Sequence, residues 1–473
     1  MTSPLIILAV LAVTGPALAY AQQATMSVTD ATAAMDTGLD GADAPQPEPA
    51  PSWRDDWRVR GYLWSEGRYM DFAGDSLGQL AASRMPARQG YFEGNLDLRW
   101  SPHETVAANL DASALYLTDT GARLWLRESN IEANPGDWRF VLGKSRVTYS
   151  LSAGLSPADL LNPPRDPAQP EIQAEGAWMA LAQMARDNWA VSAIWSPQVR
   201  ADADGLPQFA RAEAGDFRAV LRGYVNLRET DLNLMLYWLN DSQNTGCCQA
   251  YALSTARVIG RFELHGEATV ARYEALGLLG SAQALAVPAD MSEAGLPAAA
   301  AARLAGLAAE APQRPAAQDW QVLGLLGGRY MSDSNQMALL EYYYNSAGLT
   351  VADRQSVARM IWMLQSTQRA YPELDLASRM DAGGLRNRDG VLGRHLLVAS
   401  WTWAELRDYY TPRLVWQQSL DDGSFMAFAA LDARLADPVL LTVGAAVPVG
   451  AMDTEFGMAG LDWRGFGRLT FYF

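Results

Sequence analysis

The sequence predicts an all-β protein, a transmembrane antiparallel β-barrel of about eighteen strands with helical segments in its long extracellular loops. Three observations support this fold class. From residue 53 onward, segments of about 10 to 14 residues alternate apolar and polar side chains, as strands with one wet face do. No apolar run approaches the ~20 residues that a transmembrane helix needs. The connections between segments alternate between short and long.

The N-terminal segment 1–21 predicts a cleavable signal peptide. Its apolar stretch from Leu5 to Val13 is about nine residues long, too short to span a bilayer as a helix. Gly15-Pro16 and overlapping small-x-small sites follow, although no Lys or Arg precedes the stretch. Segment 22–52 is rich in Ala, Pro and acidic residues, so we expect a disordered periplasmic segment. The barrel is expected to occupy 53–473.

One segment illustrates the alternation. Between Tyr91 and Trp100, one face carries Phe92, Gly94, Leu96, Leu98 and Trp100, and the other carries Glu93, Asn95, Asp97 and Arg99. A soluble sandwich does not tolerate a strand face this long and polar unless water covers it. The same division recurs at 218–228, 261–270 and 461–473. The pattern therefore predicts polar side chains facing a water-filled lumen and apolar side chains facing lipid.

The predicted strands are 57–68, 90–101, 104–117, 121–133, 137–150, 171–185, 188–197, 216–228, 230–241, 249–259, 261–275, 318–331, 334–346, 391–406, 408–420, 424–435, 437–448 and 459–473. All long connections belong to one alternate set, near 69–89, 151–170, 198–215, 276–317 and 347–390. Short periplasmic turns alternating with long extracellular loops are expected of this architecture. A miscount by one strand would mix the short and long connections. This parity of the connections is therefore the strongest internal check on the predicted strand count.

Two of the long loops carry helical signals. Thr350 to Asp353 resembles a capping box at the start of a helical loop at 351–370. Apolar residues then recur at helical spacing, namely Val357, Met360, Ile361 and Leu364. The Ala-rich run from Leu296 to Ala309 has high helix propensity but little periodicity. Each loop either folds into the pore or over its mouth, or lies outside the barrel.

Charge and cysteine content restrict the partners. The net charge of −16 argues against nucleic acid, which attracts basic surfaces. The two cysteines, Cys247 and Cys248, are adjacent and cannot cross-link distant parts of the chain. They form a strained vicinal disulfide or remain free thiols. No cofactor is predicted.

Two motifs carry a resemblance to a known family. Residues 141–164 read VLGKSRVTYSLSAGLSPADLLNPP, and the chain ends in GRLTFYF. The chain resembles the porin-like outer-membrane barrels of proteobacteria and is similar to the alginate-exporter type. This resemblance implies about eighteen strands, an outer-membrane location and a C-terminal Phe473 that the barrel-assembly machinery reads. The chain departs from the family where Tyr149-Ser150 replaces the usual Trp-Gly, which puts a shared constriction geometry in doubt.

The loop in this motif is suited to narrowing the lumen. Ser156 can act as an N-cap with Pro157 at the first position of a helical turn, and Asn162-Pro163 then ends it. We predict a constriction loop whose key residues are Pro157, Asp159, Asn162 and Pro163. The alternative is an external loop that proline merely stiffens.

Charged side chains on the polar strand faces are the candidate transport residues. The predicted lumen set is Arg58, Arg60, Arg99, Lys144, Arg146, Arg222, Glu128, Glu263, His265, Glu267, Arg464 and Arg468. Rings of charged side chains set the selectivity of pores, and a basic ladder would favour anions. Because acidic and basic residues nearly balance in the proposed lumen, the alternative is a structural lattice in which they satisfy one another.

Enzymatic and metal-dependent functions are weaker interpretations. Residues 74–78 read GDSLG, which matches lipase and esterase motifs, but they lie in a polar loop and the chain has only three His. Glu263, His265 and Glu267 share a strand face, yet their spacing of about 7 Å between alternate Cα atoms rarely converges three metal ligands. We therefore predict no catalytic residue and no metal site.

The sequence thus predicts an outer-membrane channel for passive passage of polar or anionic solutes, such as saccharides or organic acids. Expected partners are outer-membrane lipid, the solute and the barrel-assembly machinery, without nucleic acid. The alternative is a loop-plugged barrel with an adhesive or envelope-structural role. The solute, the direction of flux and the oligomeric state stay open.

Overall fold

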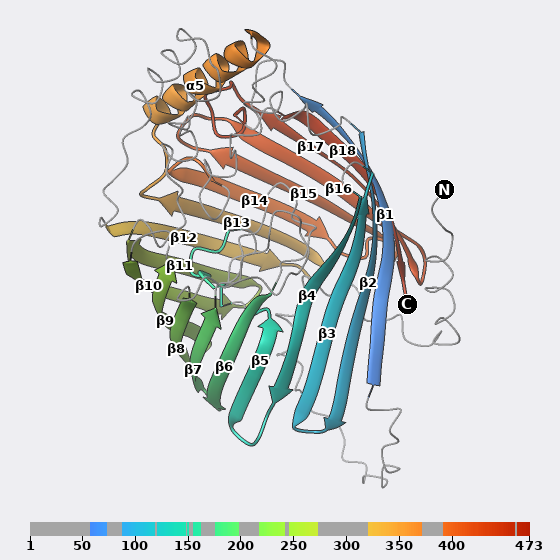
Figure 1. The fold of residues 1–473 in the computed structure, drawn as a ribbon, viewed down its shortest axis with the longest axis vertical. Coiled ribbons are helices and arrows are strands. Elements are labelled where there is room, and N and C mark those ends of the chain that lie inside the picture. Colours follow the sequence, from blue (N-terminus) through green and yellow to red (C-terminus); the bar gives the residue numbers. More distant parts are fainter. Residues whose placement is uncertain are drawn as a thin grey trace.

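The computed structural model describes residues 57–72, 88–118, 121–147, 149–150, 155–161, 176–197, 217–241, 246–272, 320–370, 391–458 and 461–473. These residues form one closed sheet of 18 antiparallel strands (Figure 1). Each strand pairs with its neighbours in sequence, and β1 also pairs with β18. Closure leaves no edge strand, so backbone N–H and C=O groups are satisfied without water.

The strands are β1 (Trp57–Phe72), β2 (Arg88–His103), β3 (Val106–Leu117), β4 (Gly121–Ala133), β5 (Trp138–Ser145), β6 (Ala177–Arg186), β7 (Trp189–Pro197), β8 (Phe217–Leu227), β9 (Thr230–Asp241), β10 (Gly246–Ile259), β11 (Phe262–Arg272), β12 (Trp320–Met331), β13 (Gln336–Asn345), β14 (His395–Trp403), β15 (Tyr410–Ser419), β16 (Phe425–Ala436), β17 (Val439–Val449) and β18 (Leu461–Tyr472). The fold class and strand order predicted from the sequence are confirmed.

The prediction was wrong at the end of β5, which stops at Ser145 rather than at residue 150. Gly143 has a φ of +126°, and a Cβ there would clash with the Ser129 carbonyl. Immediately beyond the strand, the Arg146 amide donates to the Glu128 carboxylate at 3.1 Å. The chain therefore leaves the sheet and turns toward the lumen while its apolar–polar alternation continues.

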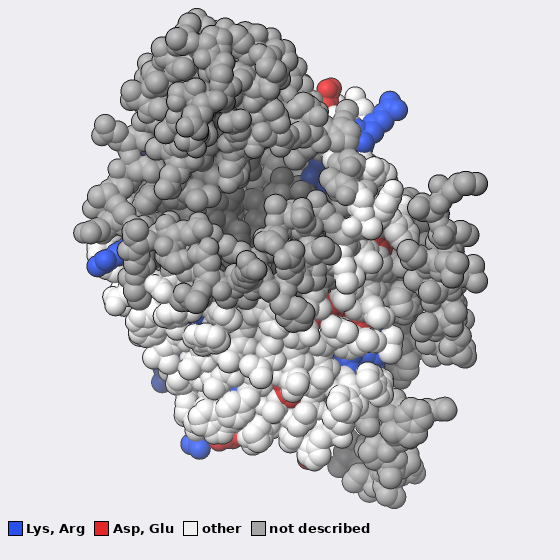
Figure 2. Space-filling model, viewed as in Figure 1, with Lys and Arg blue, Asp and Glu red and all other residues white. Residues whose placement is uncertain are grey.

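The outward side chains are apolar and exposed. They include Leu142 and Leu326, whose exposed fractions are 66% and 68%. Aromatic rings gather near the strand ends, where Trp57 stacks on Trp100 at 5.7 Å. In Figure 2, the described surface in the lower part of the molecule is largely white, with few charged atoms. An apolar surface on a closed barrel is the arrangement that lipid requires, so this is a protein of the outer membrane.

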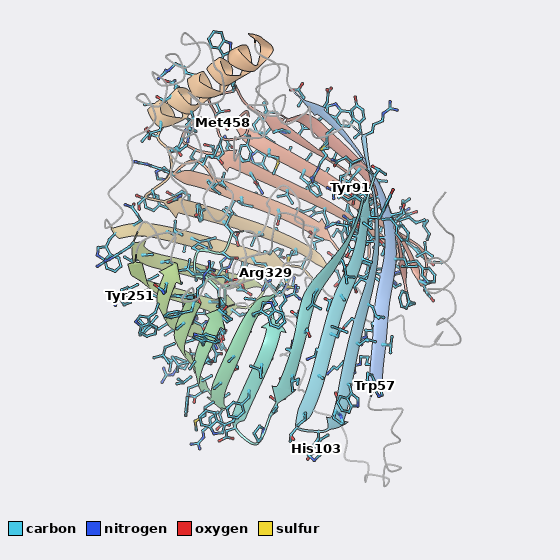
Figure 3. The ribbon with its side chains drawn as sticks, in the orientation of Figure 1. Trp57, Tyr91, His103, Tyr251, Arg329 and Met458 are labelled. Carbon is cyan, nitrogen blue, oxygen red and sulfur yellow. The ribbon has the colours of Figure 1, made fainter. Side chains whose placement is uncertain are left out.

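The connections divide between the two ends of the barrel as the parity predicts. The strand ends that the long connections join lie at the end of the barrel where α5 (Val351–Ala370) is found, and the strand ends at Trp57 and His103 lie at the other (Figures 1 and 3). The capping box at the start of α5 is confirmed: Asp353 N donates to Thr350 Oγ1 at 3.2 Å, and Thr350 N donates to Asp353 Oδ2 at 2.9 Å. Among the described residues, no helix is long and apolar enough to cross a bilayer.

Several expectations fall outside the described residues. They concern the signal peptide, the segment 22–52, the GDSLG motif, the run 296–309 and the side chains of Cys247 and Cys248.

Candidate functional site

The segment 155–161, between β5 and β6, lies inside the barrel. Tyr237 on β9 donates its hydroxyl to the Ala158 carbonyl at 2.7 Å, and Thr269 on β11 donates to the Pro157 carbonyl at 2.8 Å. The Ala158 amide in turn donates to Glu267 Oε2 at 3.2 Å. Backbone groups of the segment are therefore held by side chains from two strands.

A third strand and the segment itself complete this attachment. Arg218 on β8 donates through Nη1 to the carbonyls of Leu160 and Leu161, at 2.7 and 3.2 Å. Within the segment, Asp159 N donates to the Ser156 carbonyl at 3.1 Å, and Leu161 N donates to Asp159 Oδ1 at 3.2 Å. These bonds make a compact turn rather than a helix.

Apolar side chains of the segment pack on one side of the lumen. Leu155, Leu160 and Leu161 are at most 5% exposed and belong to one buried cluster with inward residues of β5 to β14. We call these strand residues the apolar wall: Val141, Met179, Leu181, Ile194, Val220, Met235, Tyr237, Leu239, Ala250, Ala252, Ala271, Leu323, Leu325, Tyr343, Leu396 and Val398. The inward residues of the apolar wall differ from the polar faces that the sequence pattern predicts, because the segment 155–161 covers this part of the lumen and keeps it dry.

The opposite side of the lumen, the charged wall, consists of the inward residues of β1 to β4 and β18. Glu66 on β1 pairs with Arg68 and accepts from Arg468 Nε on β18 at 2.7 Å. Glu93 on β2 accepts from Tyr62 and Trp64 at 3.1 Å each and pairs with Arg127 on β4. These carboxylates are buried, and each pairs with a cation, Glu66 with Arg468 from the adjacent β18 and Glu93 with Arg127 from β4, two strands away.

The periplasmic part of the charged wall is more open. Arg58 on β1 faces Arg99 on β2 in the strand register, and Arg60 faces Asp97. The three arginines are exposed, and within the described part of the chain they form no ion pair at 4 Å or closer. Like charges directly across a strand pair destabilise it, so this arrangement is costly for the fold.

Beside these arginines lies a row of carboxylates. The register places Asp97 opposite Asp111 and Asp111 opposite Glu128. Asn95 donates to Asp111 Oδ1 at 2.5 Å, and Arg146 Nε lies 3.8 Å from Glu128. In the part of the chain that the structure describes, no group of three His, Cys, Asp or Glu is placed to hold a metal ion.

The remaining predicted lumen residues mostly contact other wall residues. His265 Nε2 lies 3.0 Å from Glu341, and Glu263 pairs with Arg329. Arg222 donates through Nε to Asn233 at 2.8 Å and lies 4.3 Å from the centre of the Tyr149 ring. Arg464 faces inward on β18 and is 6% exposed. Figure 3 labels Arg329 among the side chains drawn along the strands.

Lys144 lies near the end of β5, where the register pairs it with Ser129 and with Trp178. It is buried, and its Nζ donates to the Leu126 carbonyl at 2.7 Å. The regular alternation of β5 is interrupted just before it, at Gly143. Of the predicted constriction residues, Pro157 and Asp159 lie in the inward segment, whereas Asn162 and Pro163 fall outside the described residues.

Sequence reasoning missed three contributors to the charged wall. Glu66 and Arg68 share strand parity with Arg58, so extending the alternation along β1 would have found them. Arg127 escaped notice because the pairing of β3 with β4 shifts between Asp111 and Ala112. Such a bulge brings two successive residues, Arg127 and Glu128, to the same side, and no local sequence signal marks it.

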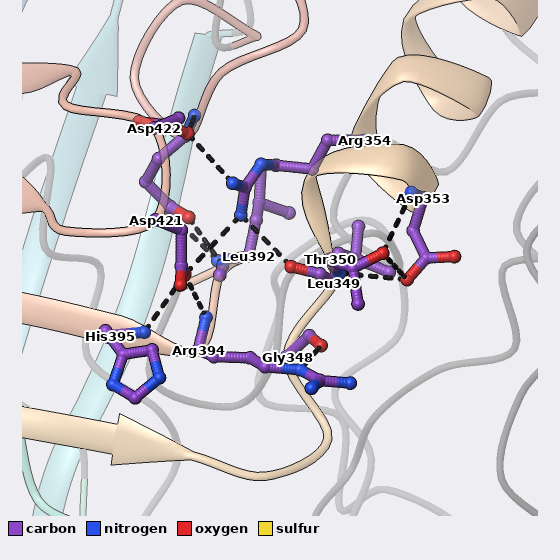
Figure 4. Close-up of polar contacts among 12 residues, drawn as sticks. Gly348, Leu349, Thr350, Asp353, Arg354, Leu392, Arg394, His395, Asp421 and Asp422 are labelled. Atoms are coloured by element: carbon purple, nitrogen blue, oxygen red, sulfur yellow. Dashed lines mark hydrogen bonds and ion pairs between the residues drawn. The ribbon is translucent and has the colours of Figure 1, made fainter.

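At the extracellular end, one buried arginine ties α5 to the barrel (Figure 4). Arg354 is 0% exposed; its Nη1 donates to the Leu349 carbonyl at 3.1 Å, and its Nη2 lies 3.1 Å from Asp422 Oδ2. Asp421 Oδ2 accepts from the amides of Arg394 and His395 at 2.7 and 3.1 Å. The base of α5 and the start of β14 are thus fixed to the turn between β15 and β16.

Further hydrogen bonds extend this cluster. Glu455 accepts from the amides of Leu392 and Gly393 at 2.8 and 2.6 Å. Burial acts to raise the pKa of Asp422, but hydrogen bonds from Ser424 and the Glu455 amide, together with the Arg354 charge, hold that pKa below its usual value. Asp422 is therefore anionic at neutral pH and pairs with Arg354.

No protein-family model matches the sequence, and no curated protein matches it. Among solved structures, Pseudomonas aeruginosa OccK3 (OpdO) is similar at 10% identity, with 89% of this chain and 96% of that chain covered and a TM-score of 0.48. Pseudomonas aeruginosa OccK5 (OpdH) is similar at 10% identity, with 89% and 100% covered and a TM-score of 0.47. A mutant of the Rh. blastica porin is similar at 10% identity, with 88% and 100% covered and a TM-score of 0.39. Likeness at this level leaves the function to be inferred from the barrel itself.

Proposed function

We propose that this outer-membrane barrel is a channel for passive passage of small polar solutes, with a preference for anions. The observation that carries the proposal is the division of the lumen: the segment 155–161 fills the side of the apolar wall, and the charged wall remains for water and solute. The protein needs no catalytic residue for this role.

The inward segment acts as a fixed constriction rather than as a moving gate. Burial of a Leu side chain contributes about 1.5–3 kcal/mol, so Leu155, Leu160 and Leu161 together contribute about 5–9 kcal/mol to docking. Hydrogen bonds from Tyr237, Thr269 and Arg218 add to this packing and help to offset the entropy of ordering the segment. The constriction therefore sets the pore size at rest.

The anion preference follows from which charges are paired. Glu66 and Glu93 are buried and neutralised by arginines, so they contribute little field to the lumen. Arg58, Arg60 and Arg99 are exposed at the periplasmic end. Rings of unpaired guanidinium groups favour carboxylate and phosphate groups. Organic acids and acidic saccharides are the solute classes that we propose, and export of an acidic polysaccharide is the sharper variant.

The two ends of the chain have proposed roles in export and assembly. The C-terminal Phe473 exchanges backbone hydrogen bonds with Gly61, at 2.9 and 3.0 Å, where β18 closes onto β1. This position supports recognition of the last strand by the barrel-assembly machinery before closure. The segment 1–21 is proposed to direct export to the periplasm.

An alternative role in adhesion or envelope structure is favoured by one observation, the rigid attachment of α5 through Arg354. A plugged barrel would use such a fixed surface and would not conduct. Single-channel recording in a planar bilayer separates the two roles, because a structural plug gives no ohmic current.

The anion preference is tested by the reversal potential in a salt gradient. We expect the combined change Arg58→Ala, Arg60→Ala and Arg99→Ala to move the reversal potential toward cation selectivity. The matched control is Arg261→Ala, which removes an exposed arginine of a periplasmic turn that pairs with Asp333. An unchanged potential in the triple variant would refute the role of the three arginines.

A further inference from the structure

A groove with a volume of about 520 Å³ runs along the outer face of the barrel over β6. Its floor consists of Ala180 and Ala182 on β6 and Ala193 on β7. The register explains the shape, because Phe140 and Leu142 on β5 and Trp195 on β7 stand beside these alanines. Small side chains flanked by large ones leave a channel about one strand wide.

The groove lies at the depth of the periplasmic leaflet. Arg186 ends β6 at the periplasmic turn, four residues after Ala182 and six after Ala180. At about 3.3 Å per residue and a strand tilt near 40°, Ala182 lies about 10 Å and Ala180 about 15 Å from the periplasmic turn, against an apolar band ~25 Å tall. The groove therefore runs from the tails of the periplasmic leaflet to the middle of the bilayer.

The same strands carry headgroup-binding chemistry at their periplasmic ends. Arg186 pairs with Asp137 at 2.9 Å, and its side chain is 56% exposed. Trp189 lies directly opposite Arg186 in the register, and Trp138 stacks on Phe140 at 5.7 Å. Tryptophan and arginine at this level are typical of contacts with lipid headgroups. A phosphate would compete with Asp137 for the exposed guanidinium group.

A second copy of the chain fits this surface less well than lipid does. A two-fold interface places the same patch on both subunits, so a groove meeting itself would enclose a void. An acyl chain fills a narrow apolar groove and carries a phosphate that the Arg186 charge complements. We propose that a phospholipid of the periplasmic leaflet docks here, with one acyl chain along β6 and its phosphate against Arg186.

The test measures phospholipid that stays bound when the full-length barrel is extracted from outer membranes in mild detergent. Native mass spectrometry counts retained lipids per barrel, and lipid extraction identifies them. Ala182→Phe fills the groove. We expect it to lower the lipid occupancy about tenfold, because the acyl chain would lose the burial of about two methylene groups. The control, Ala429→Phe, places the same ring at an exposed position of β16 and leaves the occupancy unchanged.

A second variant tests the headgroup. We expect Arg186→Gln to weaken rebinding of added phospholipid, measured by the shift in melting temperature, while Arg261→Gln has no effect. Retention of the same phospholipid by Ala182→Phe would overturn the proposal. So would a retained lipopolysaccharide, or a wild-type dimer that Ala182→Phe converts to a monomer. Unchanged single-channel conductance shows that each variant is folded, and the outcome is independent of the solute that the channel carries.

Discussion

The two sides of the lumen are built on different principles. The charged wall buries Glu66 and Glu93 by pairing them with arginines, Glu66 with Arg68 and Glu93 with Arg127. The apolar wall carries Leu, Met and Ala at the same inward parity and is covered by the segment 155–161. The difference shows that strand parity fixes whether a side chain points into the lumen. Whether water reaches that side chain depends on the segment 155–161, which returns into the barrel.

The largest expected effect comes from breaking a buried pair in the charged wall. Glu93→Ala removes the carboxylate that pairs with the buried Arg127 and should lower the free energy of unfolding by about 3–5 kcal/mol. Urea unfolding in lipid vesicles measures this change. Asp333→Ala breaks an exposed pair with Arg261 and should cost less than about 1 kcal/mol. Equal costs for the two variants would show that the Glu93 pair is not buried.

The next effect concerns the apolar wall. Leu160→Ala removes a side chain that is 2% exposed and should weaken docking of the segment by about 2–4 kcal/mol. We expect a higher mean conductance with frequent transitions between current levels. Ser156→Ala, in the same segment but half-buried, serves as the control. If Leu160→Ala conducts like the wild type, the segment does not limit the pore.

A smaller effect is expected at the polar attachment of the same segment. Glu267→Gln keeps the side-chain volume but weakens the hydrogen bonds from the Ala158 amide and the Ser150 hydroxyl, at a cost of about 1–2 kcal/mol. The open-channel current should become noisier, with little change in its mean. A large rise in mean conductance would mean that polar bonds, rather than apolar packing, hold the constriction.

The smallest effect is the pH dependence of the extracellular cluster. Because the pKa of Asp422 is lowered in the folded protein, its contribution is fully present above the usual Asp pKa of about 4 and is lost as the pH falls through the lower folded value. Proteolysis of α5 should therefore accelerate only in strong acid. Asp422→Asn should remove this acid-dependent step, and persistence of the step would assign it to another group.

Much of the fold could be predicted because alternation is a local signal. The eighteen strands and the helix from Val351 follow from side-chain spacing alone. The apolar wall could not be foreseen, since inward Ala252 and Met235 are compatible with a wet or a dry lumen until the position of Leu160 is known. The ion pairs could not be predicted from the sequence either, because the contact between Glu93 and Arg127 depends on the register of β1 to β4.

The account rests on solute and water reaching the charged wall and not the apolar wall. The direct measurement is block of single-channel current by a water-soluble charged thiol reagent, with Cys247 and Cys248 replaced by Ser. Asn109→Cys on β3 should react and reduce the current, whereas Ala252→Cys on β10, where the native side chain is 2% exposed, should stay unmodified. Reaction at position 252 as fast as at position 109 would contradict the account.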